Sequence, residues 1–198
     1  IRPLGETEEE SGFFDEATPA LIDLAEPLSG PGRLLELSRL ILAWRNRLPE
    51  AIRALHSGSP LIAPASPADA IWLARDLAEL IDAIETEERD WADLDNLKVE
   101  NYADWWKLTL EFLKIAAEWW PARLGELKRS SPSRHATTLL DAEARRLAGL
   151  IDGGPVIVAG STGSVPAAAR LIATVAKMPN GTVVLPGLDT VMPEDHWQ

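Results

Sequence analysis

The stretch Pro155-Val-Ile-Val-Ala-Gly-Ser-Thr-Gly-Ser-Val-Pro166 marks a change of fold along the chain. Its first five residues form a short apolar run rich in β-branched side chains, which is typical of a strand buried on both faces. The glycine- and serine-rich residues 160–164 predict a turn, and residues 166–178 have a helical pattern. After a second turn at residues 179–181, residues 182–185 predict another buried strand. The sequence therefore predicts a βαβ unit, whose right-handed crossover would make its two strands parallel.

Helical periodicity dominates the chain before this unit, up to about residue 150. Pro49 is expected to kink or split the first helix, and Ser66-Pro67-Ala68-Asp69 predicts a capped start for the second. The acidic residues 85–95 are expected to end that second helix. Four helices are expected, each with one apolar face. The first face consists of Leu37, Ile41, Trp44, Leu48, Ile52 and Leu55, and the second of Ala70, Leu73, Leu77, Leu80, Ile81 and Ile84. The third consists of Tyr102, Trp105, Thr109, Phe112, Ala116 and Trp119, and the fourth of Leu139, Leu140, Ala144, Leu147 and Leu150.

Composition restricts the classes of protein to consider. The 198 residues are 46% hydrophobic and 25% charged, which is typical of a soluble globular chain. The absence of Cys excludes disulfide scaffolds, thiolate metal sites and Cys nucleophiles. The net charge of −12 disfavours binding of nucleic acid by the chain as a whole. Arg145 and Arg146, or the cations from Arg123 to Arg134, could still line a local basic groove, although such arginines more often lie on a solvated helix face.

The tryptophans allow two interpretations. Aromatic platforms stack unpaired bases, so a role in single-strand binding is conceivable. However, Trp105 and Trp119 share the expected core face of their helix, and Trp106, Leu113 and Trp120 repeat every seven residues beside it. Core packing is therefore favoured, and we expect Trp105, Phe112 and Trp119 to be buried between helices. The eight tryptophans are Trp44, Trp72, Trp91, Trp105, Trp106, Trp119, Trp120 and Trp197.

No catalytic residue and no metal ligand is predicted. His56, His135 and His196 are far apart in sequence and have no helical partner three or four residues away. The acidic residues 85–95 lack the alternating spacing and the glycine of a calcium loop. The turn at residues 159–163 reads Ala-Gly-Ser-Thr-Gly, which does not match the nucleophile elbow Gly-x-Ser-x-Gly.

The turn Gly160-Ser161-Thr162-Gly163 could instead face a phosphate, because glycine-rich turns at helix N-termini bind anions. Asp189, after the second strand, would suit a ribose. The third glycine of the dinucleotide fingerprint is missing, with Pro166 near its place, and no Lys follows to make a P-loop. A nucleotide-binding, Rossmann-like oxidoreductase fragment is therefore the alternative interpretation, and a purely helical interaction module is a third.

Several blocks of this sequence resemble a known family. The block Val158-Ala-Gly-Ser-Thr-Gly-Ser-Val-Pro166, followed by Val183-Val-Leu-Pro-Gly-Leu-Asp189, resembles the alphaproteobacterial type of AddB, the B subunit of the AddAB helicase–nuclease of double-strand break repair. The resemblance covers nearly the whole chain. Its other blocks are Ile1-Arg-Pro-Leu-Gly-Glu6, Pro64-Ala-Ser-Pro-Ala-Asp69, Leu108-Thr-Leu-Glu-Phe-Leu-Lys-Ile115 and Glu194-Asp-His-Trp197.

The resemblance implies an internal segment of the helicase-like half of an AddB-type subunit, mainly α in class. Residues 1–14 would be a strand end and an acidic loop of the first motor-like lobe. Residues 15–150 would form a helical, 1B-like subdomain. Residues 151–198 would form a βαβ segment of the same superfamily 1 helicase-like α/β lobe, where a working helicase carries its Walker B strand.

The resemblance also implies that this segment is not catalytic. A motor ATPase ends its Walker B strand with an Asp that holds Mg²⁺ and a Glu that positions water. Here that position is degenerate, because Ala159 and Gly160 can do neither. We therefore expect no cofactor in the segment and no hydrolysis by it.

The implied partners are an AddA-type helicase–nuclease subunit and, through the full complex, double-stranded DNA ends and their unwound strands. No membrane is expected, and the location would be the bacterial cytoplasm. Two strands rarely form a stable sheet alone. We therefore also expect an apolar sheet face and an unpaired strand edge near Val156, Ile157, Val183 and Val184, which are either covered by self-association or left as an exposed apolar patch.

Overall fold

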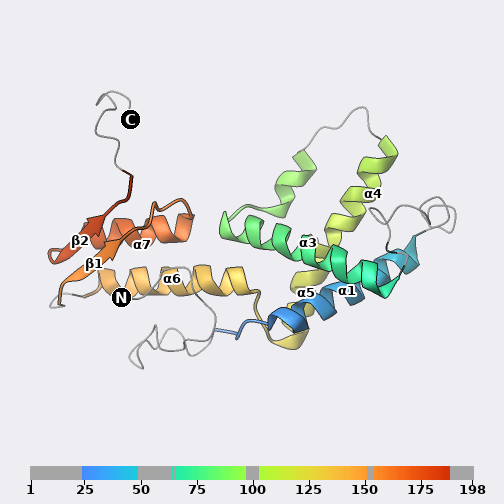
Figure 1. The fold of residues 1–198 in the computed structure, drawn as a ribbon, viewed down its shortest axis with the longest axis horizontal. Coiled ribbons are helices and arrows are strands. Elements are labelled where there is room, and N and C mark those ends of the chain that lie inside the picture. The colour runs from blue at the N-terminus through green and yellow to red at the C-terminus, as the bar shows by residue number, and fades with distance from the viewer. Residues whose placement is uncertain (1–23, 49–63, 65, 97–102, 151–153, 188–198) are drawn as a thin grey trace. The chain divides into compact units, whose positions relative to one another are not determined.

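The computed structural model describes residues 24–48, 64, 66–96, 103–150 and 154–187 (Figure 1). These residues are mainly helical, with a small two-stranded parallel sheet, as the sequence predicts. In chain order the elements are α1 (Gly30–Arg47), α3 (Pro67–Thr86), a 3₁₀ helix (Trp91–Asn96), α4 (Ala103–Lys114), a π-helical segment (Ile115–Trp119), α5 (Trp120–Leu127), α6 (Pro132–Ala148), β1 (Val156–Ala159), α7 (Pro166–Ala176) and β2 (Gly181–Val184).

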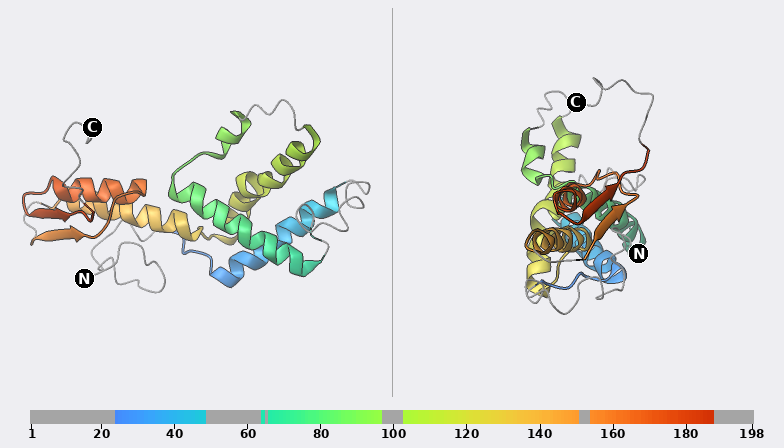
Figure 2. Two further views of the ribbon diagram at one scale, coloured as in Figure 1. Left: turned by 45° about the horizontal axis from the view of Figure 1, so that its top comes forward. Right: turned by 90° about the vertical axis from the view of Figure 1, so that its left-hand side faces the viewer.

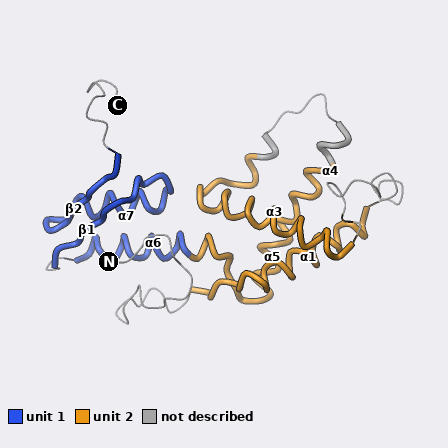
Figure 3. Tube along the Cα trace, in the orientation of Figure 1, with its two compact units in different colours: residues 1–23, 136–198 blue, residues 24–135 orange. Residues whose placement is uncertain are grey.

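The described chain divides into two compact units (Figure 3). The helical unit comprises residues Leu24–His135 and contains α1, α3, α4 and α5. The βαβ unit, as far as it is described, begins at Ala136 and contains most of α6 together with β1, α7 and β2. The boundary therefore lies within α6, and the helix that precedes the sheet packs largely with it.

The core of the helical unit forms where α1 packs on α3. The predicted face of α1 is confirmed, because Leu37, Ile41, Trp44 and Leu48 are all buried. The helix ends at Arg47, and Leu48 has an extended backbone (ψ 142°). The following Pro49 explains this ending, since a proline disfavours helical geometry in the residue before it. Ile52 and Leu55 lie outside the described residues.

The start of α3 is capped as the sequence predicts. The Ser66 hydroxyl accepts a hydrogen bond from the Asp69 amide, and the Asp69 carboxylate accepts one from the Ser66 amide. The prediction for Leu80 is wrong, because its side chain is 40% exposed. Alanines occupy the buried seam instead, and their small side chains let α1 approach closely. The buried residues of α3 are Ala70, Ala74, Leu77, Ala78 and Ile81.

The π-helical segment between α4 and α5 changes which tryptophan is buried. Pro121 follows it in the first turn of α5. A proline inside a continuous α-helix lacks an N–H and clashes with the carbonyl four residues earlier, and a π-turn is one way to relieve this. The wider turn shifts the core face by one residue. Trp120 is consequently 1% exposed, whereas Trp119, the expected core residue, is only partly buried.

Phe112 was expected to be buried but is only partly buried; it packs against the core, with its ring centre 5.1 Å from that of Trp44 in an edge-to-face arrangement. Trp105 and Trp106 belong to α4, but their side chains lie outside the described residues. Further buried residues on the same helical stretch are Ile115, Ala116 and Leu124.

The βαβ unit has the predicted parallel topology. β1 pairs with β2 in a register that sets Val156 opposite Gly181. Figures 1 and 2 show α7 lying along one face of this sheet. Gly181 is required by this packing, because a Cβ there would lie 1.8 Å from the Val175 carbonyl oxygen. Leu171 and Val175 of α7 and Ala144 and Leu147 of α6 form the unit's core, packed against Leu140, Val156, Val158, Met178 and Val183.

The prediction that both strands are buried on two faces is wrong for the described chain. Burial alternates along each strand, and Ile157 and Val184 are 65% and 54% exposed. The expected open apolar face is therefore present at these two residues, while Val156 and Val183 pack against the helices. The two helices cover one face only, and Leu150, expected in the core, is 37% exposed.

We predict that Trp120→Ala lowers the free energy of unfolding of the helical unit by about 3–5 kcal/mol, because a buried indole is removed. Urea denaturation followed by circular dichroism measures this loss. Trp72→Ala is the matched control, since Trp72 is 66% exposed, and should change stability by less than about 0.5 kcal/mol. A larger loss in Trp119→Ala than in Trp120→Ala would contradict the shift of the core face.

We also predict that the chain self-associates through the open face of its sheet. In sedimentation velocity, the double variant Ile157→Lys/Val184→Lys should shift the distribution toward monomer, because two charges then occupy the exposed apolar face. Leu35→Lys, at a comparably exposed position on α1, should leave the distribution unchanged. Monomeric behaviour of the unaltered chain at all concentrations would refute the prediction.

Candidate functional site

The turn after β1 is the candidate site that the sequence indicates, and two glycines shape it. Gly160 has φ +81° and Gly163 φ +69°, a region that L side chains rarely adopt. The Gly160 amide donates to the Val184 carbonyl at 3.0 Å, which continues the strand pairing into the turn. The Gly163 amide donates to the Ser161 hydroxyl at 3.3 Å. The turn therefore has a defined conformation and begins where the two strands end.

The N-terminus of α7 follows this turn. Val165 precedes the helix and caps it with no side chain, and Pro166 opens it without an N–H. Such an uncapped start can favour an anion through the helix dipole. Packing, however, already accounts for Gly163, because a Cβ there would meet the Ile172 side chain at 3.3 Å. A Cβ at Gly160 would meet no atom within 4 Å, so only the backbone angle requires glycine there.

The polar groups of the turn are hydroxyls. Thr162 and Ser164 lie 3.5 Å apart through their hydroxyl oxygens. On α7, the Arg170 guanidinium forms a two-pronged ion pair with Asp141 of α6, at 2.8 and 2.9 Å, so its charge is already balanced. Hydroxyls and amides can bind an oxyanion, but they supply neither a general base nor a carboxylate ligand for a cation at this turn.

The structure places Ala159 and Gly160 at the end of β1, as predicted. The chain that leaves β2 beside them reads Leu185-Pro186-Gly187, and neither strand end bears a carboxylate within the described residues. Asp189, the expected ribose ligand, lies outside them. In the described ranges, no three His, Asp or Glu side chains come close enough to hold a metal ion.

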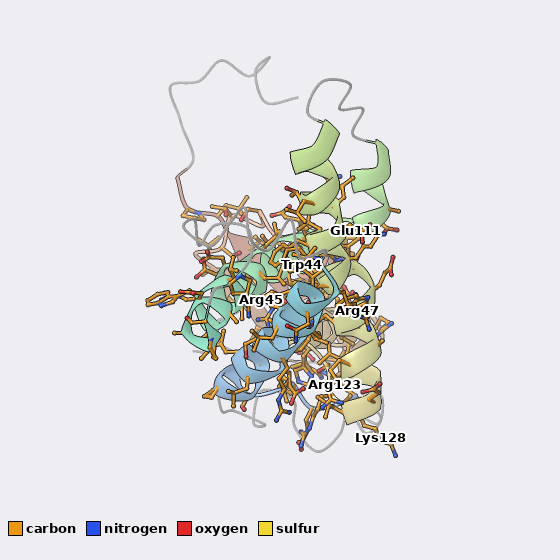
Figure 4. All side chains as sticks on the ribbon, turned by 90° about the vertical axis from the view of Figure 1, so that its right-hand side faces the viewer. Trp44, Arg45, Arg47, Glu111, Arg123 and Lys128 are labelled. Carbon is orange, nitrogen blue, oxygen red and sulfur yellow. The ribbon has the colours of Figure 1, made fainter. Side chains whose placement is uncertain are left out.

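The candidate basic grooves are largely neutralised by ion pairs. Arg123 binds Glu36 at 2.8 Å and Glu126 at 2.7 Å. The hydrogen bond from Arg123 holds the pKa of Glu36 below its usual value, and Glu36 in turn raises the pKa of Arg123. Figure 4 shows Arg123 and Lys128 on one side of the helical unit, with Arg45 and Arg47. The remaining pairs are Arg129 with Glu26, Arg134 with Glu85, and Arg146 with Glu143.

Sequence reasoning missed a polar cluster beneath the end of α3. Arg33 donates to Asp82 at 2.7 Å, and the Ser133 hydroxyl lies 2.7 Å from both Asp82 and Glu85. Ser131, which is fully buried, also donates to Glu85. Glu85 was expected only as the first residue of the acidic stretch that ends the helix, but it also connects α3 to the start of α6. Its hydroxyl partners lie some fifty positions away in sequence, so no local pattern could indicate them.

The histidines do not form a site in the described chain. His135 lies with its Nδ1 atom 3.1 Å from the Ala25 carbonyl oxygen and 3.4 Å from the Ser130 hydroxyl. These contacts fix the loop before α1 against the start of α6. His56 and His196 lie outside the described residues.

Comparison with protein-family models, with curated proteins and with solved structures found no match. Among the described residues, no helix has the length and apolar character that crossing a bilayer requires.

The two glycines of the turn should respond differently to alanine. Gly160→Ala should lower the free energy of unfolding by about 1–2 kcal/mol, which is the cost of a left-handed backbone for a residue with a Cβ. Gly163→Ala should cost more, because its Cβ also presses on Ile172 at 3.3 Å. Thermal denaturation of both variants measures the difference. Equal costs would show that Ile172 moves aside and that packing does not require Gly163.

Proposed function

We propose that this chain is a non-catalytic, helicase-like segment of an AddB-type subunit. In this proposal it works within an AddAB-type helicase–nuclease that processes DNA double-strand break ends for homologous recombination. The sequence blocks around residues 158–166 and 183–189 are the basis of the proposed family. The fold supports it in outline, since a largely helical assembly precedes a parallel βαβ unit.

One observation carries the non-catalytic part of the proposal. In α/β folds, nucleotides bind at the carboxyl ends of parallel strands. The end of β1 offers Ala159 and Gly160 at that edge, where a motor ATPase needs an Asp for Mg²⁺ and a Glu for the attacking water. The side chains of Ala159 and Gly160, a methyl group and a hydrogen atom, can neither bind Mg²⁺ nor position a water molecule. The lobe would then serve as a scaffold within the complex.

The proposal includes the partners of such a segment. An AddA-type subunit would supply helicase activity, and double-stranded DNA ends and unwound strands would reach the segment through the full complex. The location would be the bacterial cytoplasm, with no part in a membrane and no cofactor in this segment. Residues 15–150, which include the helical unit, would correspond to the 1B-like subdomain.

A nucleotide-binding, Rossmann-like oxidoreductase fragment is the second candidate. The observation that favours it is the strand–turn–helix junction itself, where Gly160 and Gly163 both have positive φ and no side chain caps α7. Against it, the contact between Gly163 and Ile172 already explains one of the two glycines, and the fingerprint's third glycine is missing.

A nucleotide titration separates these candidates. ATP, ADP, NAD and NADP, each with Mg²⁺, should give no saturable change in the chain's tryptophan fluorescence and no hydrolysis. The double variant Ala159→Asp/Gly160→Glu should also remain inactive, because the chain has no phosphate-binding loop. Saturable binding of NAD or NADP would favour the oxidoreductase, and Mg²⁺-dependent turnover of ATP would refute the non-catalytic assignment.

The DNA role needs a complex of an AddA-type subunit with a full-length AddB-type subunit that contains this segment. Deleting the region that corresponds to residues 24–135 should weaken salt-dependent binding of forked DNA while the subunits still co-purify. Unchanged DNA binding after this deletion would leave the helical unit without a DNA role.

A further inference from the structure

The outward surface of α3 carries an exposed tryptophan that the fold does not use. Trp72 is 66% exposed, whereas Trp44 and Trp120 are buried and Trp119 is partly covered by the Arg47 guanidinium, 4.6 Å from its ring centre. Tryptophan is usually well buried because its side chain has the largest apolar area. No other described residue buries this indole, so its apolar area is open to a partner.

Helical spacing places Trp72 opposite the core. The buried residues Ala70, Ala74, Leu77 and Ile81 define the inward side of α3. Trp72, Asp76, Glu79 and Ala83 follow one another at spacings of four, three and four, which defines a second stripe on the opposite side. All four residues of this outward stripe are exposed. Leu80, beside the stripe, adds a further 40%-exposed apolar side chain.

The negative charge of α3 indicates that a partner at this surface is basic. The helix carries five acidic residues and one basic residue, Arg75, so that its formal charge is 1 − 5 = −4. Asp82 and Glu85 are engaged in the polar cluster, and Asp69 caps the helix. On the outward stripe, Glu79 pairs only loosely with Arg75, at 3.4 Å, and Asp76 has no ion pair within the described chain. Such a surface repels phosphates and attracts cations.

We propose that the outward stripe of α3 is a docking surface for a basic amphipathic segment of a partner protein, with Trp72 as its central anchor. An arginine or lysine of the partner would stack on the indole, as Arg47 stacks on Trp119 within this chain, while aliphatic side chains contact Trp72 and Leu80. Asp76 and Glu79 would pair with flanking cations and set the orientation. This surface lies on the helical unit and includes neither of the exposed sheet residues, Ile157 and Val184.

The test uses the full chain and a synthetic peptide. The probe is a fluorescently labelled amphipathic helix as long as α3, with a leucine stripe flanked by arginines; its twin has glutamate at every arginine. The arginine peptide should bind saturably and more weakly as salt rises. Trp72→Ala and Asp76→Lys/Glu79→Lys should each weaken binding about tenfold or more, as expected for hot-spot residues.

Two control variants lie outside the stripe. Leu35→Ala removes an apolar side chain of similar exposure from α1, and Glu118→Lys reverses an exposed charge on the π-helical segment; both should retain wild-type affinity. Circular dichroism verifies the fold of each variant, and Trp72→Gln replaces Trp72→Ala if that variant loses helicity.

Three outcomes would overturn the proposal. The first is the absence of saturable binding of the arginine peptide, and the second is equal binding of the glutamate twin or of the stripe variants. The third is that Trp72→Ala abolishes self-association in sedimentation without peptide, because a second copy of the chain would then cover the stripe. The nucleotide titration and the forked-DNA assay use no peptide, and the forked-DNA assay removes the whole helical unit rather than altering the stripe, so loss of peptide binding in Trp72→Ala is separable from failure of the proposed function.

Discussion

The packing of α1 on α3 depends on a buried arginine as much as on its apolar seam. Arg33 is 6% exposed and donates to the Asp82 carboxylate at 2.7 Å and to the Ala78 carbonyl at 3.0 Å. A charge removed from water is costly unless it is paired. Sliding α1 by one turn would keep leucines and alanines in contact but leave this guanidinium without its acceptors. The ion pair therefore sets the register of α1 against α3, because the small alanine side chains alone would allow several registers.

The same pair connects the seam to the rest of the helical unit. Asp82 also accepts from Ser133 at the start of α6, and Ser133 reaches Glu85. The end of α3 thus fixes where α6 begins. All members of the polar cluster belong to the helical unit, which ends at His135 in the first turn of α6. A cluster of this kind is satisfied only when all its members are in place, which favours one arrangement of α1 on α3 over alternatives of similar apolar area.

Local patterns predicted the elements well, and long-range geometry explains what they missed. The capping box at Ser66, the end of α1 before Pro49 and the parallel βαβ unit all follow from interactions within a few residues. Trp120 is buried in place of Trp119 because the π-helical segment shifts the buried face of the helix by one residue. A regular helical period of 3.6 residues does not predict such a shift. For the candidate site, the sequence located the turn at residues 160–163 but could not show that Ile172 already accounts for Gly163.

The two uncovered apolar surfaces have different physical requirements. The sheet face at Ile157 and Val184 carries no charge, and no other described strand pairs with β1 or β2, so the natural complement of this face is another apolar layer or a further strand. The stripe at Trp72 is flanked by Asp76 and Glu79, so its complement must bring cations as well as apolar area. An uncharged apolar layer could cover the sheet face, but on the stripe it would leave the carboxylates of Asp76 and Glu79 without a counter-charge. The two surfaces therefore call for chemically different partners.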